Sequence, residues 1–78
     1  MKYGIYVIRD QRTSFLTPTV DMNDASAMRN FEHAIQDKNS LFFSHVEDYS
    51  LYRIGTYDSD TGSIDPEMAT LLVDGKSF

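Results

Sequence analysis

Apolar and polar positions alternate near the start of the chain, which is typical of a β-strand with two distinct faces. The segment KYGIYVIRD divides its apolar residues between these faces, with Tyr3, Ile5 and Val7 opposed to Tyr6 and Ile8. After a polar turn, the segment FLTPTV predicts a second strand. Pro18 has no N–H group for a strand ladder, so we expect this strand to lie at a sheet edge or to pair on one side only.

A helical period follows in the segment NDASAMRNFEHAIQDKN, where we predict a helix over residues 24–37. Asn23 or Asp24 can cap its first turn by accepting hydrogen bonds from backbone N–H groups that lack a partner within the helix. The apolar residues form a single stripe along this helix: Ala27, Met28, Phe31, Ala34 and Ile35. We expect the helix to pack on the sheet through the largest of them: Met28, Phe31 and Ile35.

The second half of the chain contains two further predicted strands and a turn. LFFSHV, residues 41–46, reads as a short strand, and LYRIGTYD, residues 51–58, reads as a longer one. The loop DSDTGS predicts a hairpin, since Gly62 adopts a positive φ angle without steric cost. Residues 66–78 are ambiguous, because an Asp–Pro pair can start a helix whereas TLLV suits a short strand.

These elements predict an α+β fold, a small β-β-α-β-β domain with a mostly antiparallel sheet and one helix packed on one face. We place the domain at residues 1–65 and a variable C-terminal tail, a short helix or strand, at residues 66–78. One helix can cover only one face, yet the first strand is apolar on both. The tail, a second subunit or a ligand must therefore cover the other face, and we expect a homodimer.

Within the strand at 51–58, strict alternation separates two sets of side chains. Leu51, Arg53, Gly55 and Tyr57 share one face, and the other face carries Tyr52, Ile54 and Thr56. We expect the second set to be the drier one, with Tyr52 or Tyr57 available to point outward.

Charge is distributed unevenly along the 78 residues. The net charge is −5, composed of +2 over residues 1–20 and −7 over residues 21–78, which argues against strong nonspecific DNA binding. There is no cysteine, so a disulfide framework and thiolate metal sites are excluded. The sequence shows neither a signal peptide nor a stretch long enough to cross a membrane, and we expect a soluble intracellular protein without membrane contact.

No motif in the sequence predicts catalysis or metal binding. His33 and His45 have no recognisable ligand spacing, and a structural or solvent-exposed role is the more common one for such residues. DSDTG resembles the opening of a calcium loop, but Gly62 comes too early and Ala69 stands where the final acidic ligand belongs. We therefore expect a protein that is not an enzyme and has no catalytic residues, metal or cofactor.

Aromatic and basic residues suggest one kind of binding surface. Aromatic rings on a sheet beside arginines can stack the bases of single-stranded nucleic acid. Tyr6 and Tyr52 would stack bases if exposed, while the phosphates would be contacted by Lys2, Arg9, Arg12 and Arg53. The alternative is that the rings pack against each other or against a partner subunit, and composition alone favours this alternative.

Several segments together resemble a known viral family. MKYGIYVIRD, FLTPTVD, DASAMRNFEHA and DYSLYRIGTYDSDTG occur in the same order and at similar spacing in the small nonstructural protein of gokushoviruses, single-stranded DNA phages of the Microviridae. The resemblance runs from Met1 to about Ile64. It implies a protein of the host cytoplasm that is not part of the mature virion and that assists single-stranded DNA synthesis or packaging, by binding single-stranded DNA or phage replication or assembly proteins. The alternative function is a non-enzymatic interaction or regulatory factor that binds a phage or host protein and no DNA.

Overall fold

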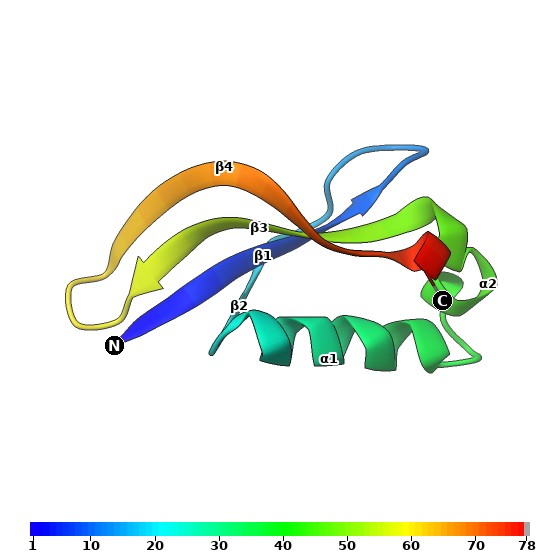
Figure 1. The fold of residues 1–78 in the computed structure, drawn as a ribbon, viewed down its shortest axis with the longest axis horizontal. Coiled ribbons are helices and arrows are strands. Elements are labelled where there is room, and N and C mark those ends of the chain that lie inside the picture. Colours follow the sequence, from blue (N-terminus) through cyan, green and yellow to red (C-terminus); the bar gives the residue numbers. More distant parts are fainter. Residues whose placement is uncertain (78) are drawn as a thin grey trace.

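The alternating apolar residues at the start of the chain form β1 (Lys2–Asp10), a central strand of a four-stranded sheet in this computed structural model (Figure 1). The structure describes residues 1–77. β1 lies between β2 (Thr19–Asp21) and β3 (Tyr49–Asp58), and β4 (Ser63–Asp74) completes the order β2-β1-β3-β4. All neighbouring strands are antiparallel, which confirms the predicted α+β class.

The predicted edge position of the second strand is confirmed, although the strand is shorter than expected. β2 begins at Thr19, directly after Pro18, and pairs only with β1. Phe15 contributes an isolated bridge to Arg9 rather than a continuous ladder. Because Pro18 has no backbone N–H group to donate, regular pairing with β1 begins only after it.

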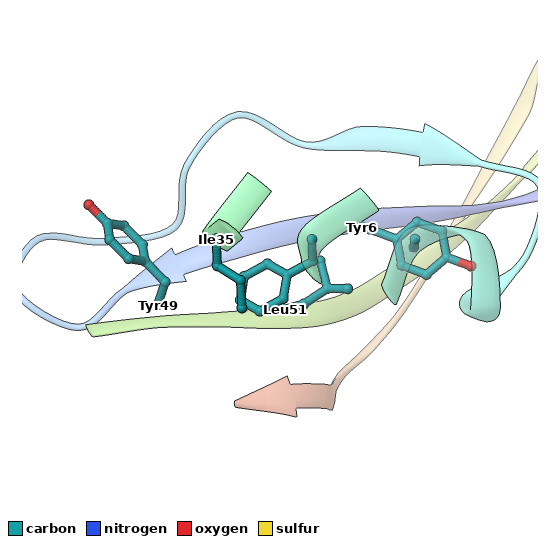
Figure 2. Close-up of a cluster of buried hydrophobic side chains, with 6 residues drawn as sticks. Tyr6, Ile35, Tyr49 and Leu51 are labelled. Atoms are coloured by element: carbon teal, nitrogen blue, oxygen red, sulfur yellow. The ribbon is translucent and has the colours of Figure 1, made fainter. Parts of the chain in front are cut away.

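Helix α1 (Asp24–Gln36) covers one face of the sheet, as predicted (Figure 1). The Asn23 side chain caps it by accepting a hydrogen bond of 2.9 Å from the backbone N–H of Ser26. The core consists of side chains from α1, β1 and β3: Ala27, Phe31 and Ile35 with Tyr6, Tyr49 and Leu51. Figure 2 shows Ile35 next to Leu51, with Tyr6 and Tyr49 on either side. Met28 was expected in this core but is 37% exposed, because the smaller Ala27 faces the sheet in its place.

The predicted strand at residues 41–46 is wrong. Residues Leu41–Ser44 form a short helix, α2, and Val46–Asp48 form a 3₁₀ turn that leads into β3. The Ser40 hydroxyl caps α2 by accepting a hydrogen bond of 3.0 Å from the backbone N–H of Phe42. Helical geometry turns Phe42 onto Tyr49, with ring centroids 4.7 Å apart, so this segment extends the core without adding a strand.

Of the two alternatives for the C-terminal part, the structure shows the strand. β4 runs through Pro66 and continues to Asp74, followed by a 3₁₀ turn at Gly75–Ser77, so the boundary expected after residue 65 falls inside a strand. The hairpin before β4 is confirmed, with Gly62 at a φ angle of 78°. β4 is an edge strand, where proline is tolerated, and it arches away from β3 in Figure 1. The pairing of β4 with β3 shifts register between Arg53 and Gly55.

The expectation that Tyr52, Ile54 and Thr56 form the drier face of β3 is also wrong. Leu51, from the opposite set, is 4% exposed and packs against α1, whereas Tyr52 is half-buried on the other face. In the pairing of β3 with β1, Ile54 has no partner, because Tyr6 pairs with Arg53 and Ile5 pairs with Gly55. This extra residue places Tyr57 on the face opposite Leu51. Strict alternation fails here because the bulge adds one residue to β3 and inverts the faces beyond it.

The face of the sheet opposite α1 receives part of its cover from the connection between β1 and β2. Val7 is only 4% exposed, and it lines an apolar hollow of about 330 Å³ with Phe15, Leu16, Pro18, Ile54 and Ala69. Figure 1 shows this connection as a blue loop on the side of the sheet away from α1. No helix within residues 1–77 is long and apolar enough to cross a membrane.

Candidate nucleic-acid interface

Tyr6 does not lie on an open surface, as a stacking role would require. Its side chain is fully buried, with 0% exposed area, beneath α1. The hydroxyl donates a hydrogen bond of 2.6 Å to the Asp24 carboxylate at the start of α1. Burial, together with this hydrogen bond, raises the pKa of Tyr6 to about 12. Because the ring is enclosed by the core, the condition under which Tyr6 would stack bases is not met.

Arg53 is occupied by contacts within the protein. Its guanidinium donates hydrogen bonds to Asp24 at 2.6 Å and to Glu67 at 3.1 Å, and another to the Thr56 hydroxyl at 3.1 Å. The guanidinium also lies 5.8 Å from the centre of the Tyr6 ring. Two carboxylates therefore neutralise this arginine, so the predicted role of Arg53 in phosphate binding does not fit its surroundings.

The same contacts fasten α1 and β4 to the sheet. The hydrogen bond from Tyr6 and the one from Arg53 hold the pKa of Asp24 below its ordinary value. Hydrogen bonds from Thr56 and Arg53 lower the pKa of Glu67 in the same way. This polar cluster is thus structural: it fixes the first turn of α1 and the arch of β4 by charge-assisted hydrogen bonds.

A second group of predicted residues does form a surface, on the face opposite α1. The Arg9 guanidinium lies 5.4 Å from the centre of the Phe15 ring, which is 48% exposed. Phe15 meets Tyr52 edge to face, with ring centroids 5.7 Å apart. Arg9 makes no ion pair within residues 1–77, so its charge is available to a ligand.

A second aromatic pair lies on this face towards the other end of β1. Tyr3 and Tyr57 are partners across the strands, and their rings stack at 6.4 Å with planes 29° apart. In β1, Tyr3 is the partner of Tyr57 and Val7 is the partner of Tyr52. Four positions separate Tyr3 from Val7, so the two aromatic pairs lie about 13 Å apart along β1. We call these four rings, Tyr3, Phe15, Tyr52 and Tyr57, the aromatic face.

The other two predicted cations lie at opposite ends of β1. Arg12 is 79% exposed and forms an ion pair of 3.1 Å with Asp48, which offsets part of its charge. Lys2 is exposed and stands opposite Asp58 in the strand register. About 23 Å of strand separates Lys2 from Arg9, so the predicted cations form two small groups rather than one patch.

Sequence reasoning included Tyr52 and Arg9 in the site but missed Phe15 and Tyr3. Tyr3 was recognisable in principle, because it shares the alternating face of Val7. Phe15 gave no such signal, because it follows a turn and its position depends on how that turn folds back onto Arg9.

Residues 1–77 contain no cluster of three or more His, Cys, Asp or Glu side chains that could hold a metal ion. His45 lies beside its neighbour, with 2.8 Å between its Nδ1 and the Ser44 hydroxyl, and His33 is exposed on α1. The two histidines therefore belong to different parts of the surface, one on α1 and one after α2.

Comparison with known proteins gives a viral assignment. Neither the curated proteins nor the solved structures searched contain a match to this chain. A family model described as "Phage ORF5 protein" matches residues 3–78, nearly the whole length. The match includes both helices, strands β2 to β4 and all of β1 except its first residue, Lys2. The chain therefore belongs to the phage ORF5 protein family.

Proposed function

We propose that this phage protein assists the synthesis or packaging of a single-stranded DNA genome by binding the single strand on its aromatic face. The observation that carries the proposal is the cluster of Arg9, Phe15 and Tyr52, in which an unpaired cation lies against the exposed Phe15 ring and Phe15 contacts the half-buried Tyr52. The resemblance to gokushovirus nonstructural proteins supports the same role. That role is non-enzymatic and is exercised in the host cytoplasm, by a protein that is not part of the mature virion.

The chemistry of the aromatic face suits unpaired bases. Every base has a flat face that can stack on an aromatic side chain, and each such contact contributes about 1–3 kcal/mol. The two aromatic pairs are about 13 Å apart, which corresponds to roughly four nucleotides at ~3.4 Å per nucleotide. In a duplex the bases are already stacked and paired, so the rings gain little from contacting it.

The small number of cations determines how binding depends on salt. Arg9 and Arg12 lie at one end of the aromatic face, whereas Lys2, at the other end of β1, alternates with Tyr3 onto the opposite side of the sheet, so about two phosphates can be neutralised. For single strands, two contacts predict a slope of about −1.4 in a plot of log affinity against log salt concentration. The net charge of −5 opposes nonspecific binding, which favours modest affinity.

Fluorescence anisotropy with labelled single-stranded and duplex oligonucleotides, at low and moderate salt, tests the proposal. We expect the wild-type protein to bind single strands more tightly than duplexes. Arg9→Glu combined with Arg12→Glu should abolish binding while the circular dichroism spectrum is preserved. Absence of binding to single strands at low salt would refute the proposal.

A matched control separates local charge from net charge. Arg29→Glu combined with Lys38→Glu changes the net charge by the same amount, but both residues are exposed on the α1 side of the molecule. This control should retain nearly all of the affinity. Equal loss in both double variants would mean that overall charge, and not the aromatic face, governs binding.

A second candidate function is a factor that binds a phage or host protein and no DNA. It is favoured by apolar side chains exposed on α2, where Leu41 is 70% and Phe43 is 44% exposed. Phe43 also lines a hollow of about 420 Å³ together with Ile35 and Val46. If no oligonucleotide binds, the wild-type chain should capture a phage or host protein. The double variant Leu41→Ser, Phe43→Ser should lose this capture.

A further inference from the structure

A pocket of about 630 Å³ opens at the β2 edge of the sheet. Ile8 and Thr19 line it from the α1 side of the strands, and Phe15 connects it to the aromatic face. The connection that leads into β2 forms one side of it, α2 contributes to the other, and β1 provides a further side chain. Its lining residues are Ile8, Phe15, Leu16, Thr17, Thr19 and Phe42. Most of these residues are exposed, so the pocket is open to solvent and can receive a flat group from the surface.

The polar side chains of this pocket are those of two threonines. Thr17 and Thr19 line the pocket, and neither hydroxyl makes a hydrogen bond to another group within residues 1–77. A hydroxyl can donate one hydrogen bond and accept two, so it matches both the carbonyl and the amino groups at the edge of a base. The two aromatic side chains, Phe15 and Phe42, provide surfaces for its flat faces.

Phe15 connects this pocket to the proposed DNA surface. The same side chain lines the pocket, lies beneath the Arg9 guanidinium and contacts Tyr52. A strand that runs over Tyr52 and Phe15 with a phosphate at Arg9 would reach the pocket by turning around the β2 edge of the sheet at Phe15. An apolar protein side chain in the same place would leave both hydroxyls without partners and would make no use of the cation, so a nucleotide is the better match.

We infer that this pocket takes one unstacked base of a bound single strand, held by ring contacts and by hydrogen bonds to Thr17 and Thr19. The inference rests on the proposed function and adds a base-recognition site to it. The pocket would give the protein a preference among bases, which stacking alone does not provide.

Oligonucleotides in which an abasic site is moved one position at a time provide the test. In the wild-type protein, one abasic position should weaken binding by roughly 5- to 150-fold, the effect of losing one stacked base. In the double variant Thr17→Val, Thr19→Val, intact oligonucleotides should bind about tenfold more weakly because two hydrogen bonds are lost. The sensitive abasic position should then cost less than it does in the wild type.

Thr70→Val is the matched control, because Thr70 is an exposed strand threonine on β4, outside the pocket. It should bind intact and abasic oligonucleotides like the wild type. All variants are checked for folding by circular dichroism before affinities are compared.

The possible failures are distinguishable. If the wild-type protein binds no single strand, the proposed function is wrong and this inference falls with it. If the wild type binds but the double threonine variant has unchanged affinity and abasic profile, the pocket inference alone is wrong. Unchanged oligonucleotide affinity with stronger binding of the apolar dye anilinonaphthalene sulfonate would assign the pocket to an apolar side chain of a protein partner.

Discussion

The hydrogen bond between Tyr6 and Asp24 offers a direct measure of what fastens α1 to the sheet. Tyr6→Phe keeps the buried ring and removes only the hydroxyl, which donates to the carboxylate at 2.6 Å. Hydrogen bonds to charged groups contribute about 1.5–3 kcal/mol. The Asp24 side chain is 46% exposed and retains Arg53, so we expect a loss near the lower end, ~1–2 kcal/mol. For a domain of this size, that corresponds to a fall in melting temperature of roughly 6–12 °C.

The effect should depend on pH in a defined direction. Asp24 has a folded-state pKa below its ordinary value, so the ionised carboxylate favours folding. Its contribution is complete above the unfolded-state pKa of about 4 and is lost as the pH falls through the lowered folded-state pKa. The difference in melting temperature between wild type and Tyr6→Phe should therefore be full at neutral pH and shrink in acid.

Thermal denaturation followed by circular dichroism, at neutral and acidic pH, measures both effects. Tyr49→Phe is the matched control, because the Tyr49 hydroxyl makes no hydrogen bond within residues 1–77 and its removal should change stability by less than about 0.5 kcal/mol. An unchanged melting temperature for Tyr6→Phe would show that this hydrogen bond does not stabilise the fold, and a difference that persists undiminished in acid would show that the ionised carboxylate is not its source.

Three further predictions concern the core, the sheet and the assembly. Phe31→Ala should cost ~3–5 kcal/mol by urea denaturation because Phe31 is 2% exposed, whereas Met28→Ala should cost less than ~1 kcal/mol; equal losses would contradict the packing. Gly4→Ala should destabilise by ~1–3 kcal/mol in the same assay, since a Cβ atom there would lie 2.1 Å from the Tyr6 hydroxyl; wild-type stability would show that the ring can move. Light scattering at micromolar concentration should give twice the 8.9 kDa chain mass, because the exposed apolar residues Ile64, Met68 and Leu71 of the edge strand β4 favour a homodimer, and a monomeric mass would exclude it.

Local sequence determined the elements whose signals lie within a few residues. The period of the 24–36 segment and the cap at Asn23 specify α1 before any tertiary contact is considered. Gly62 specifies the hairpin, because it supplies the positive φ angle that this turn adopts. Pro18 confines β2 to an edge because it lacks the donor that an interior strand would need. In each case the physical cause is carried by the residue itself.

Short apolar runs were decided only by the tertiary structure. Residues 41–46 and 66–74 suit either helix or strand, because four to six apolar residues do not resolve a period of 2.0 from one of 3.6. The first became α2, where Phe42 can meet Tyr49, and the second became β4, which pairs along β3. Ser40 was a usable cap signal for α2, but the register of β4 depends on a partner strand that local sequence does not identify.

The functional surface depended most on long-range contacts. Sequence placed Tyr6 and Arg53 beside Arg9 as candidates, since all are aromatic or basic residues of neighbouring strands. Whether such a side chain is free or buried depends on where α1 docks, and α1 brings Asp24 onto both Tyr6 and Arg53. Arg9 lies on the other face and keeps its charge unpaired over Phe15, a neighbour supplied by the return of the 11–18 connection. The sequence thus identified the aromatic and basic side chains that could bind a nucleic acid. The position of α1 on one face of the sheet decided which of them are buried or paired and which are available to a ligand.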